Sequence, residues 1–315
     1  MSDKIESWFQ FRGDGVQRDF TPPEPPPWRQ FSDDSSNHRL KRGKNFIPPP
    51  GALQMINAAI YLRRPLLVTG KPGTGKTSLA YALAEELNLD ILRWNIGTRS
   101  TLKDALYRYD AIARVQDKKE TSDIGNYMRL GPLGSAFCSV PGKPKVLLID
   151  EIDKSDIDLP NDLLHVLEEG RFEIPELQRV KDLAGKEVVI ETGLSEKAKV
   201  IDGKVVCKEF PYVVMTSNGE RDFPPAFLRR CLRLEMDEPD IDKLRRIVAG
   251  YLGEAVQEEY DWIIEEFCDQ RDSKVLATDQ LLNAVHLVSK GKITDEQSLE
   301  VLRESLLRDV FKSLG

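Results

Sequence analysis

Hydrophobic positions along the chain follow two patterns, which divide the sequence into two parts. Up to about residue 238, apolar runs of strand length alternate with stretches of helical spacing, such as residues 51–63 and 78–87. The strand-like runs are residues 65–69, 89–96, 146–150, 212–217 and 231–236. Strands that alternate with helices predict an α/β fold with a parallel sheet covered on both faces.

From about residue 240 onward the spacing is helical only. The helical segments lie near residues 240–252, 255–271, 278–290 and 295–314. In the last segment Leu299, Leu302, Leu306 and Val310 share one face, as in an amphipathic helix. The pattern predicts a small four-helix domain, joined to the α/β part near Asp237–Asp242.

Residues 1–44 follow neither pattern. The stretch Thr21–Trp28 contains five prolines, which favour polyproline II and exclude a helix. The segment is also rich in aromatic residues, namely Trp8, Phe9, Phe11, Trp28 and Phe31. Two interpretations remain open: an arm that docks onto a partner, or an arm that packs on its own chain.

Two further segments interrupt the alternation of strands and helices. Residues 98–140 form an insertion between two predicted strands, and the part from Asp110 to Tyr127 is strongly polar. Residues 188–210 contain alternating apolar runs around Asp202-Gly203, a strong signal for a β-hairpin.

Composition and charge narrow the class of protein. The chain has 45 Lys and Arg against 52 Asp and Glu, a net charge of −7, which argues against a nucleic-acid protein that relies on general positive charge. No apolar run approaches 18 residues, and the first residues lack a signal-peptide core. We therefore expect no membrane span and a cytoplasmic protein.

The cysteines and histidines are scattered, which disfavours a metal site of their own. The residues concerned are Cys138, Cys207, Cys231, Cys268, His38, His165 and His286. The cysteines lack C-x-x-C spacing and suit free thiols in a reducing compartment. Any metal is expected to arrive with a nucleotide.

The segment from Gly70 to Thr77 fits the pattern G-x-x-x-x-G-K-[ST] at every fixed position, between a predicted strand and a predicted helix. Glycines allow backbone N–H groups to wrap a polyphosphate at the helix N-terminus. Lys76 would reach the β- and γ-phosphates, and the Thr77 hydroxyl would bind Mg²⁺. The predicted nucleotide-binding residues are Gly70, Pro72, Gly73, Thr74, Gly75, Lys76, Thr77 and Ser78.

A pair of acids ends the apolar run 146–150. Asp150 lies at the carboxyl end of a strand whose residues suit the centre of a sheet, where open α/β sheets bind ligands. Its carboxylate would hold Mg²⁺, directly or through water. Glu151 would orient and deprotonate an attacking water as the general base. The pair favours hydrolysis over transfer of phosphate to a second substrate.

Two later segments add polar candidates. Asn218 follows the run 212–217, where an amide would bind the γ-phosphate or position the attacking water. Arg229 and Arg230 lie at the end of a short helix predicted to start at Pro224-Pro225. They are candidates for an arginine finger that reaches the γ-phosphate of a neighbouring subunit, although arginines at a helix C-terminus are also favourable by themselves.

In this order, the motifs resemble those of the AAA+ ATPases, and within them the MoxR-like branch. The segments that carry the resemblance are residues 70–77, 147–154, 161–170, 216–218 and 225–231. The resemblance covers about residues 45–315. It implies a P-loop NTPase fold, with a five-stranded parallel αβα core over residues 45–238 and a helical lid over 239–315. ATP and Mg²⁺ would bind at their junction.

The resemblance also implies roles for single residues and an assembly. Lys76 and Thr77 match the phosphate-loop positions, Asp150 and Glu151 the Mg²⁺ and water positions, and Asn218 the sensor. Arg230 fits the finger position best, ahead of Arg229 and Arg221. The segment Val275–Leu281 lacks the second sensor arginine that the family often carries in its lid. Assembly would be a ring, usually a hexamer, with active sites between subunits.

The same resemblance implies roles for the insertion and the hairpin, and a type of partner. In the family the insertion carries a loop that faces the ring pore, where Tyr127-Met128 would grip a substrate polypeptide; a surface loop with one packed aromatic is the alternative. The hairpin would contact substrate or another subunit. Partners of MoxR-like proteins often contain von Willebrand A domains.

Three functions are weighed. The first is an ATP-hydrolysing ring that remodels or matures a protein partner. The second is a nucleotide-dependent switch or scaffold with little turnover, which the missing lid arginine favours. The third is a nucleic-acid motor, which the net charge disfavours. The chain does contain one small basic cluster that could contact nucleic acid, consisting of Arg39, Lys41, Arg42 and Lys44.

Overall fold

The computed structural model describes residues 9–11, 13, 15–30, 43, 45–117, 123–179, 187–271, 276–291, 293 and 298–300. The chain divides into two compact units. One comprises Pro48–Lys71 and Gly75–Asp237, and the other comprises Met1–Ile47, Pro72–Thr74 and Glu238–Gly315. Each unit is described by itself below.

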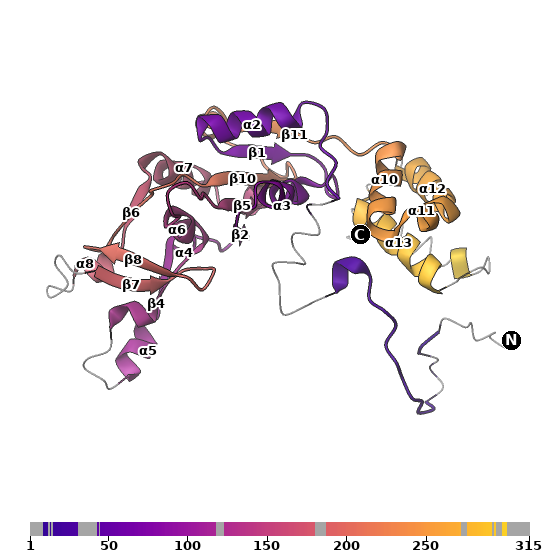
Figure 1. Ribbon diagram of the computed structural model, residues 1–315, viewed down its shortest axis with the longest axis horizontal. Coiled ribbons are helices and arrows are strands. Elements are labelled where there is room, and N and C mark those ends of the chain that lie inside the picture. Colours follow the sequence, from indigo (N-terminus) through magenta and orange to yellow (C-terminus); the bar gives the residue numbers. More distant parts are fainter. Residues whose placement is uncertain are drawn as a thin grey trace. The chain divides into compact units, whose positions relative to one another are not determined.

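A five-stranded sheet forms the centre of the larger unit, with the strand order β11-β1-β10-β5-β2 (Figure 1). Its strands are β1 (Leu66–Thr69), β2 (Ile91–Asn95), β5 (Val146–Asp150), β10 (Tyr212–Ser217) and β11 (Leu232–Glu235). All four pairings are parallel. The predicted five-stranded parallel sheet is therefore confirmed, and each strand lies within one or two residues of an apolar run in the sequence.

Helices cover both faces of this sheet, because its central strands are apolar on both sides. Every residue of β5 is buried, including the neighbours Leu147 and Leu148, which point to opposite faces. Leu147 packs in one hydrophobic cluster with residues of α6 (Pro132–Phe137) and α7 (Leu159–Glu169). α3 (Lys76–Glu86) packs on β5, β10 and β2, and α2 (Ala52–Leu62) lies along β1 and β11 (Figure 1).

A second sheet, of six strands in the order β3-β4-β7-β8-β9-β6, lies in the same unit. Its strands are β3 (Tyr107–Tyr109), β4 (Met128–Leu130), β6 (Arg171–Glu173), β7 (Glu187–Glu191), β8 (Lys197–Ile201) and β9 (Lys204–Val206). The predicted Asp202-Gly203 turn joins β8 to β9, and both residues have positive φ. The β-hairpin predicted over 188–210 is therefore present, and β7 pairs with β8 so that the hairpin belongs to a larger sheet.

The insertion predicted over residues 98–140 is largely regular structure instead of a loop. It contains α4 (Leu102–Leu106), α5 (Ala111–Gln116), the 3-10 turn η2 (Ile124–Tyr127) and α6, besides β3 and β4. Met128 is only 3% exposed and packs in the main cluster, so its predicted grip on a substrate is wrong. The Tyr127 hydroxyl donates a 2.6 Å hydrogen bond to Asp117.

The smaller unit contains α10 (Ile241–Leu252), α11 (Glu254–Glu259), α12 (Asp261–Arg271) and α13 (Thr278–Gly291). The single helix predicted over 255–271 is in fact two helices, which meet at Tyr260. Asp261 opens the second helix and is held by Arg245 at 2.5 Å and by Gln257 at 2.8 Å. The helix predicted over 295–314 lies outside the described residues, except for residues 298–300.

Part of the N-terminal arm packs on these helices. Trp28, in the 3-10 turn η1 (Pro27–Arg29), stands edge-on to Tyr251 and His286, with ring centroids 6.0 and 5.6 Å apart. Its indole N–H donates to Asn283 at 3.1 Å, and Glu24 pairs with Lys290 at 3.1 Å. Of the two interpretations of the arm, packing on its own chain holds for Trp28.

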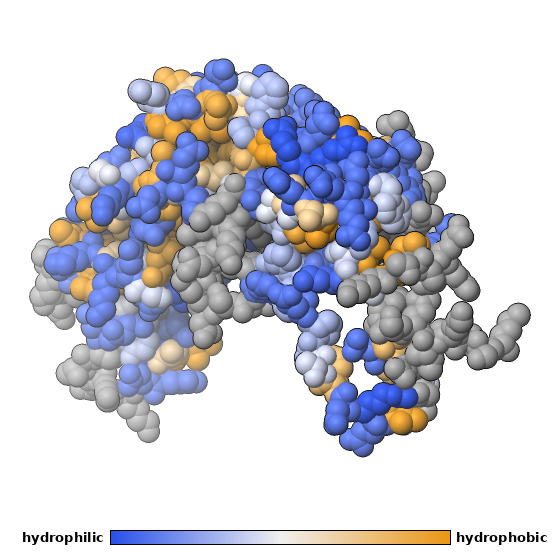
Figure 2. Space-filling model, turned by 45° about the vertical axis from the view of Figure 1, so that its right-hand side comes forward, coloured by the Kyte–Doolittle hydropathy of each residue, from blue (hydrophilic) through white to orange (hydrophobic). Residues whose placement is uncertain are grey.

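The surface mixes hydrophilic and hydrophobic residues, and the hydrophobic ones form separate clusters on the visible face (Figure 2). Among the described helices, none is long and apolar enough to cross a membrane. The four cysteines are free thiols.

Candidate functional site

The loop between β1 and α3 has the backbone that a phosphate loop requires. Gly70, Gly73 and Gly75 have φ of 150°, 80° and 93°, values that residues with a Cβ rarely adopt. Gly75 is the N-cap of α3 and supplies no side-chain cap, so the first N–H groups of the helix stay available to an anion. The glycines thus prepare an anion site at a helix N-terminus.

Lys76, at the start of α3, is only 7% exposed. Its ammonium group donates 2.7 Å hydrogen bonds to the carbonyls of Gly70 and Lys71. Burial lowers the pKa of Lys76, and the negative charges of Asp153, Asp150 and Glu151 oppose that shift. A charge held in such a poorly solvated position interacts strongly with a phosphate.

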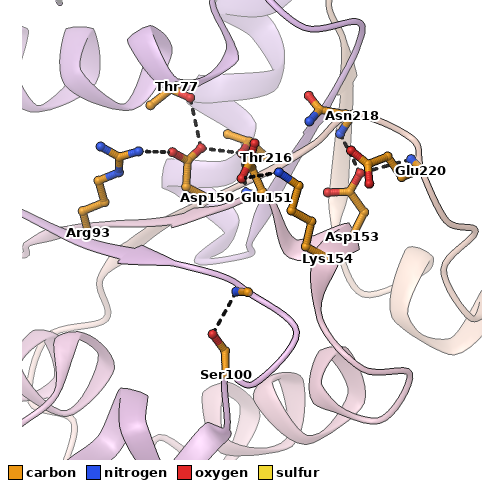
Figure 3. A network of polar contacts seen from close by, with 11 residues as sticks. Thr77, Arg93, Ser100, Asp150, Glu151, Asp153, Lys154, Thr216, Asn218 and Glu220 are labelled. Carbon is orange, nitrogen blue, oxygen red and sulfur yellow. Dashed lines mark hydrogen bonds and ion pairs between the residues drawn. The ribbon is translucent and has the colours of Figure 1, made fainter. Parts of the chain in front are cut away.

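The Asp150 carboxylate, at the carboxyl end of β5, contacts three side chains (Figure 3). Its Oδ1 accepts hydrogen bonds from the hydroxyls of Thr77 at 3.0 Å and Thr216 at 2.7 Å, and its Oδ2 lies 2.5 Å from the Arg93 guanidinium. A hydroxyl beside a carboxylate is the oxygen donor set that Mg²⁺ prefers, so the predicted ligands Thr77 and Asp150 fit that ion.

Glu151 has φ of 62°, a left-handed backbone conformation that is costly for a residue with a Cβ. Its N–H donates to the Thr216 hydroxyl at 2.9 Å. Its carboxylate lies 2.8 Å from Lys154 Nζ, and this contact raises the pKa of Lys154. Strain of this kind often marks a functional site, and here it occurs at the predicted general base.

Asn218 directly follows β10, which is hydrogen-bonded to β5 in the sheet. The N–H groups of Asn218 and Glu220 both donate to Asp153 Oδ2, at 2.8 and 3.1 Å. The turns that follow the two strands are thereby joined, as Figure 3 shows. The fold brings Lys76, Thr77, Asp150, Glu151 and Asn218 to the same edge of one sheet.

The predicted finger arginines each contact their own chain. Arg230 pairs with Glu168 at 2.6 Å, and Arg64 donates to the backbone carbonyls of Arg229 and Arg230. Arg221 donates to the carbonyl of Ser155 at 2.9 Å. Whether one of them acts toward another subunit stays a prediction.

Sequence reasoning missed Arg93, Thr216, Asp153 and Lys154. Lys154 had a signal, because it follows Glu151 by three residues and carries the opposite charge. Arg93 becomes significant only through the pairing of β2 with β5. Among the described residues, no group of three or more His, Cys, Asp or Glu is arranged to hold a metal.

Comparison with known proteins gives one family and two relatives. The model of the family described as "AAA domain (dynein-related subfamily)" matches residues 65–231, just over half of the chain. Chaperone protein ClpB 1 of Synechocystis sp. is 27% identical over 255 residues, which cover 79% of this chain and 23% of that protein. Replication factor C large subunit of Pyrococcus abyssi is 33% identical over 130 residues, which cover 40% of this chain and 26% of that protein. The alignments therefore span about a quarter of each relative.

Proposed function

The chain belongs to the AAA domain family (dynein-related subfamily), and from that membership we propose that it hydrolyses Mg-ATP within an oligomeric ring in order to remodel, activate or mature a protein partner. The observation that carries the proposal is the group at the end of β5. There, Asp150 accepts a hydrogen bond from Thr77 at the start of α3, and Glu151 directly follows Asp150, on the edge of the sheet where α/β folds bind ligands.

The backbone of residues 70–75 would wrap the phosphates, and Lys76 would exchange its carbonyl contacts for phosphate oxygens. Thr77 and Asp150 would hold Mg²⁺, which would neutralise phosphate charge when bound. Glu151 would orient a water molecule and accept its proton, and Asn218 would hold the water or the γ-phosphate. Among the described contacts, only Oε2 of Glu151 meets Lys154, so Oε1 stays available to accept that proton.

Assembly and partner belong to the proposal as well. We expect a homo-oligomeric ring, usually a hexamer, in which Arg230 or Arg229 of one subunit reaches the nucleotide of the next. The likeness to a protein named as a chaperone supports remodelling of a protein partner. Membership of the MoxR-like branch and a von Willebrand A domain partner rest only on the motifs. The net charge of −7 disfavours a nucleic-acid motor.

One observation favours a second function, a nucleotide-dependent switch with little turnover. The ion pair of Glu151 with Lys154, at 2.8 Å, occupies the predicted base in the isolated chain. A partner that breaks this pair would then raise hydrolysis. In that case nucleotide binding, and not turnover, would control assembly.

The test is steady-state ATPase activity together with the mass in solution, with and without Mg-ATP. Under the proposal, Glu151→Gln lowers kcat by at least ~100-fold, because an amide cannot accept the proton, while nucleotide still binds and the ring persists. Glu173→Gln is the matched control, since Glu173 lies in β6 and pairs with Lys204 at 3.7 Å. This control is expected to match the wild type.

The outcomes separate the two functions. Turnover that stops in Glu151→Gln but continues in Glu173→Gln supports the hydrolysing ring. A wild type that binds ATP and assembles, with negligible turnover that Glu151→Gln leaves unchanged, supports the switch. A chain that binds no nucleotide contradicts both.

A further inference from the structure

Asp153 lies two residues beyond Glu151, in the short turn η3 (Ile152–Lys154), and is only 3% exposed. Its Oδ2 accepts both the Asn218 and the Glu220 N–H groups. In Figure 3 these two bonds connect the turn after β5 to the turn after β10. Asp153 therefore touches the backbone of the predicted sensor residue directly.

Other hydrogen bonds connect the same two turns, on either side of Asp153. At one end, the Thr216 hydroxyl donates to Asp150 and accepts from the Glu151 N–H. At the other end, Arg221 donates to the Ser155 carbonyl at 2.9 Å. Among the described hydrogen bonds, those of Asp153 are the only ones that join the two turns between these two positions. One of them is made to Asn218 itself.

Two N–H groups could be satisfied by any oxygen acceptor, yet the chain buries a carboxylate here. Burial of a charge is expensive unless every polar atom is paired. Among the described residues, Asp153 Oδ1 has no hydrogen-bond partner although it is buried. Hydrogen bonds to a charged acceptor are shorter and stronger than neutral ones, so the charge gives the turn a firmer attachment. The buried Oδ1, which lacks a partner among the described residues, offsets part of that stabilisation.

We propose that Asp153 is a positioning residue, whose carboxylate holds the turn after β10 against the turn after β5 and so fixes Asn218 relative to Glu151. The inference rests on the proposed function, because Asn218 and Glu151 are the predicted sensor and base. Asp153 itself need not touch the nucleotide. Its loss would misplace Asn218 and leave Lys76 and Thr77 to bind the phosphates.

The test is a double-mutant cycle between Asp153→Ala and Asn218→Ala, with two readouts. The first is the split between kcat and KM. The second is the preference for ATPγS over ADP, measured as the ratio of their dissociation constants, which needs no turnover. We expect Asp153→Ala to lower kcat by about tenfold or more, with KM within about twofold. The preference for ATPγS should fall toward that of Asn218→Ala.

Because Asp153 acts through Asn218, the double variant should be no worse than the more severe single variant. Asp153→Asn keeps the shape and one carbonyl acceptor, and should recover part of both readouts. Asp156→Ala is the matched control: Asp156 also accepts a backbone N–H, from Leu159 at 2.9 Å, but none of the hydrogen bonds described for its side chain reaches the β10 turn. It should leave both readouts unchanged.

Asp153→Ala with wild-type kcat and nucleotide preference would overturn the inference. So would effects of Asp153→Ala and Asn218→Ala that add in full. If Asp153→Ala fails to fold, Asp153→Asn carries the same cycle, with folding checked by circular dichroism. A wild type that binds nucleotide without turnover would sink the hydrolysing ring alone, and the ATPγS preference would still decide the role of Asp153.

Discussion

At the scale of single residues, the predicted Mg²⁺ ligand Asp150 contacts Thr77 on one carboxylate oxygen and Arg93 on the other. Lys76 and Thr77 were predictable, because the phosphate-loop pattern fixes their separation from Gly70. Arg93 was not, because its ion pair with Asp150 depends on the pairing of two strands that lie more than fifty residues apart. The partner of a carboxylate is a property of the strand register, which a sequence motif does not contain.

Arg93 has a consequence for magnesium binding. Its guanidinium lies 2.5 Å from Asp150 Oδ2, while the Asp150 side chain is only 8% exposed. An incoming cation must therefore share this carboxylate with Arg93. We expect Arg93→Ala to lower the Mg²⁺ concentration at half-saturation of ATP binding by about three- to tenfold, or ~0.7–1.4 kcal/mol. The same change should destabilise the Mg²⁺-free protein by about 1–3 kcal/mol, because Oδ2 of the buried Asp150 carboxylate loses its charged donor, while Oδ1 keeps the Thr77 and Thr216 hydroxyls.

The measurement is a Mg²⁺ titration of the binding of a fluorescent ATP analogue, together with chemical unfolding in EDTA. Arg108→Ala is the control, since Arg108 is 76% exposed and meets Asp104 only at 4.0 Å. Its titration should match the wild type. An equal or higher Mg²⁺ requirement in Arg93→Ala would show that Arg93 assists the ion and does not compete with it.

At the scale of elements, prediction succeeded where the hydrophobic period was long enough to be distinctive. The central strand β5 is a run of four apolar residues before Asp150, and its place in a buried parallel sheet followed directly. The second sheet was missed because β3, β4, β6 and β9 have three residues each, too few for a period-two signal. Only the Asp202-Gly203 turn, which joins β8 to β9, was recognisable in the sequence.

Two constraints favour glycine at position 203, namely the backbone conformation and the space around its Cα. Gly203 has φ of 67°, and an added Cβ would lie 2.9 Å from Gln178 Cγ and 3.0 Å from the Ile174 carbonyl. Gly142 has a similar φ of 78°, with no atom within 4 Å of an added Cβ. We expect Gly203→Ala to cost about 2–4 kcal/mol and Gly142→Ala about 1 kcal/mol.

Urea unfolding of both variants checks this prediction, and the difference between them isolates the crowding against the segment that contains Ile174. Since the two positions share the backbone penalty, equal losses would mean that this segment moves aside easily. In that case the attachment of the β8–β9 turn would contribute little to the stability of the second sheet.

At the scale of the whole molecule, composition left the N-terminal arm undecided. Proline and aromatic residues suit both a free docking segment and a packed one. The structure assigns Trp28 to the chain's own helices, yet Phe11 of the same arm is 87% exposed. Packing of this kind depends on which side chains surround Trp28, namely Tyr251, Asn283 and His286, and these lie more than 220 residues away in the sequence.

The indole of Trp28 should therefore stabilise the helical unit. Burial and the nearby Lys290 lower the pKa of His286, so at pH 7 the indole stands against a neutral imidazole. We expect Trp28→Ala to destabilise α10 and α13 by about 1–3 kcal/mol, through lost aromatic packing and an Asn283 amide left without the indole N–H. Trp28→Phe should lose less stability, because it keeps an aromatic ring and loses only the hydrogen bond to Asn283.

Hydrogen exchange followed by mass spectrometry distinguishes this local effect from general unfolding. Amides of α10 and α13 should exchange faster in Trp28→Ala at pH 7, while those of β5 and β10 keep the wild-type rate. Phe11→Ala provides the control from the same arm and should change neither set. Unchanged exchange in α10 and α13 would mean that the arm rests on the helices without stabilising them, and docking onto a partner would again be the better explanation of its aromatic residues.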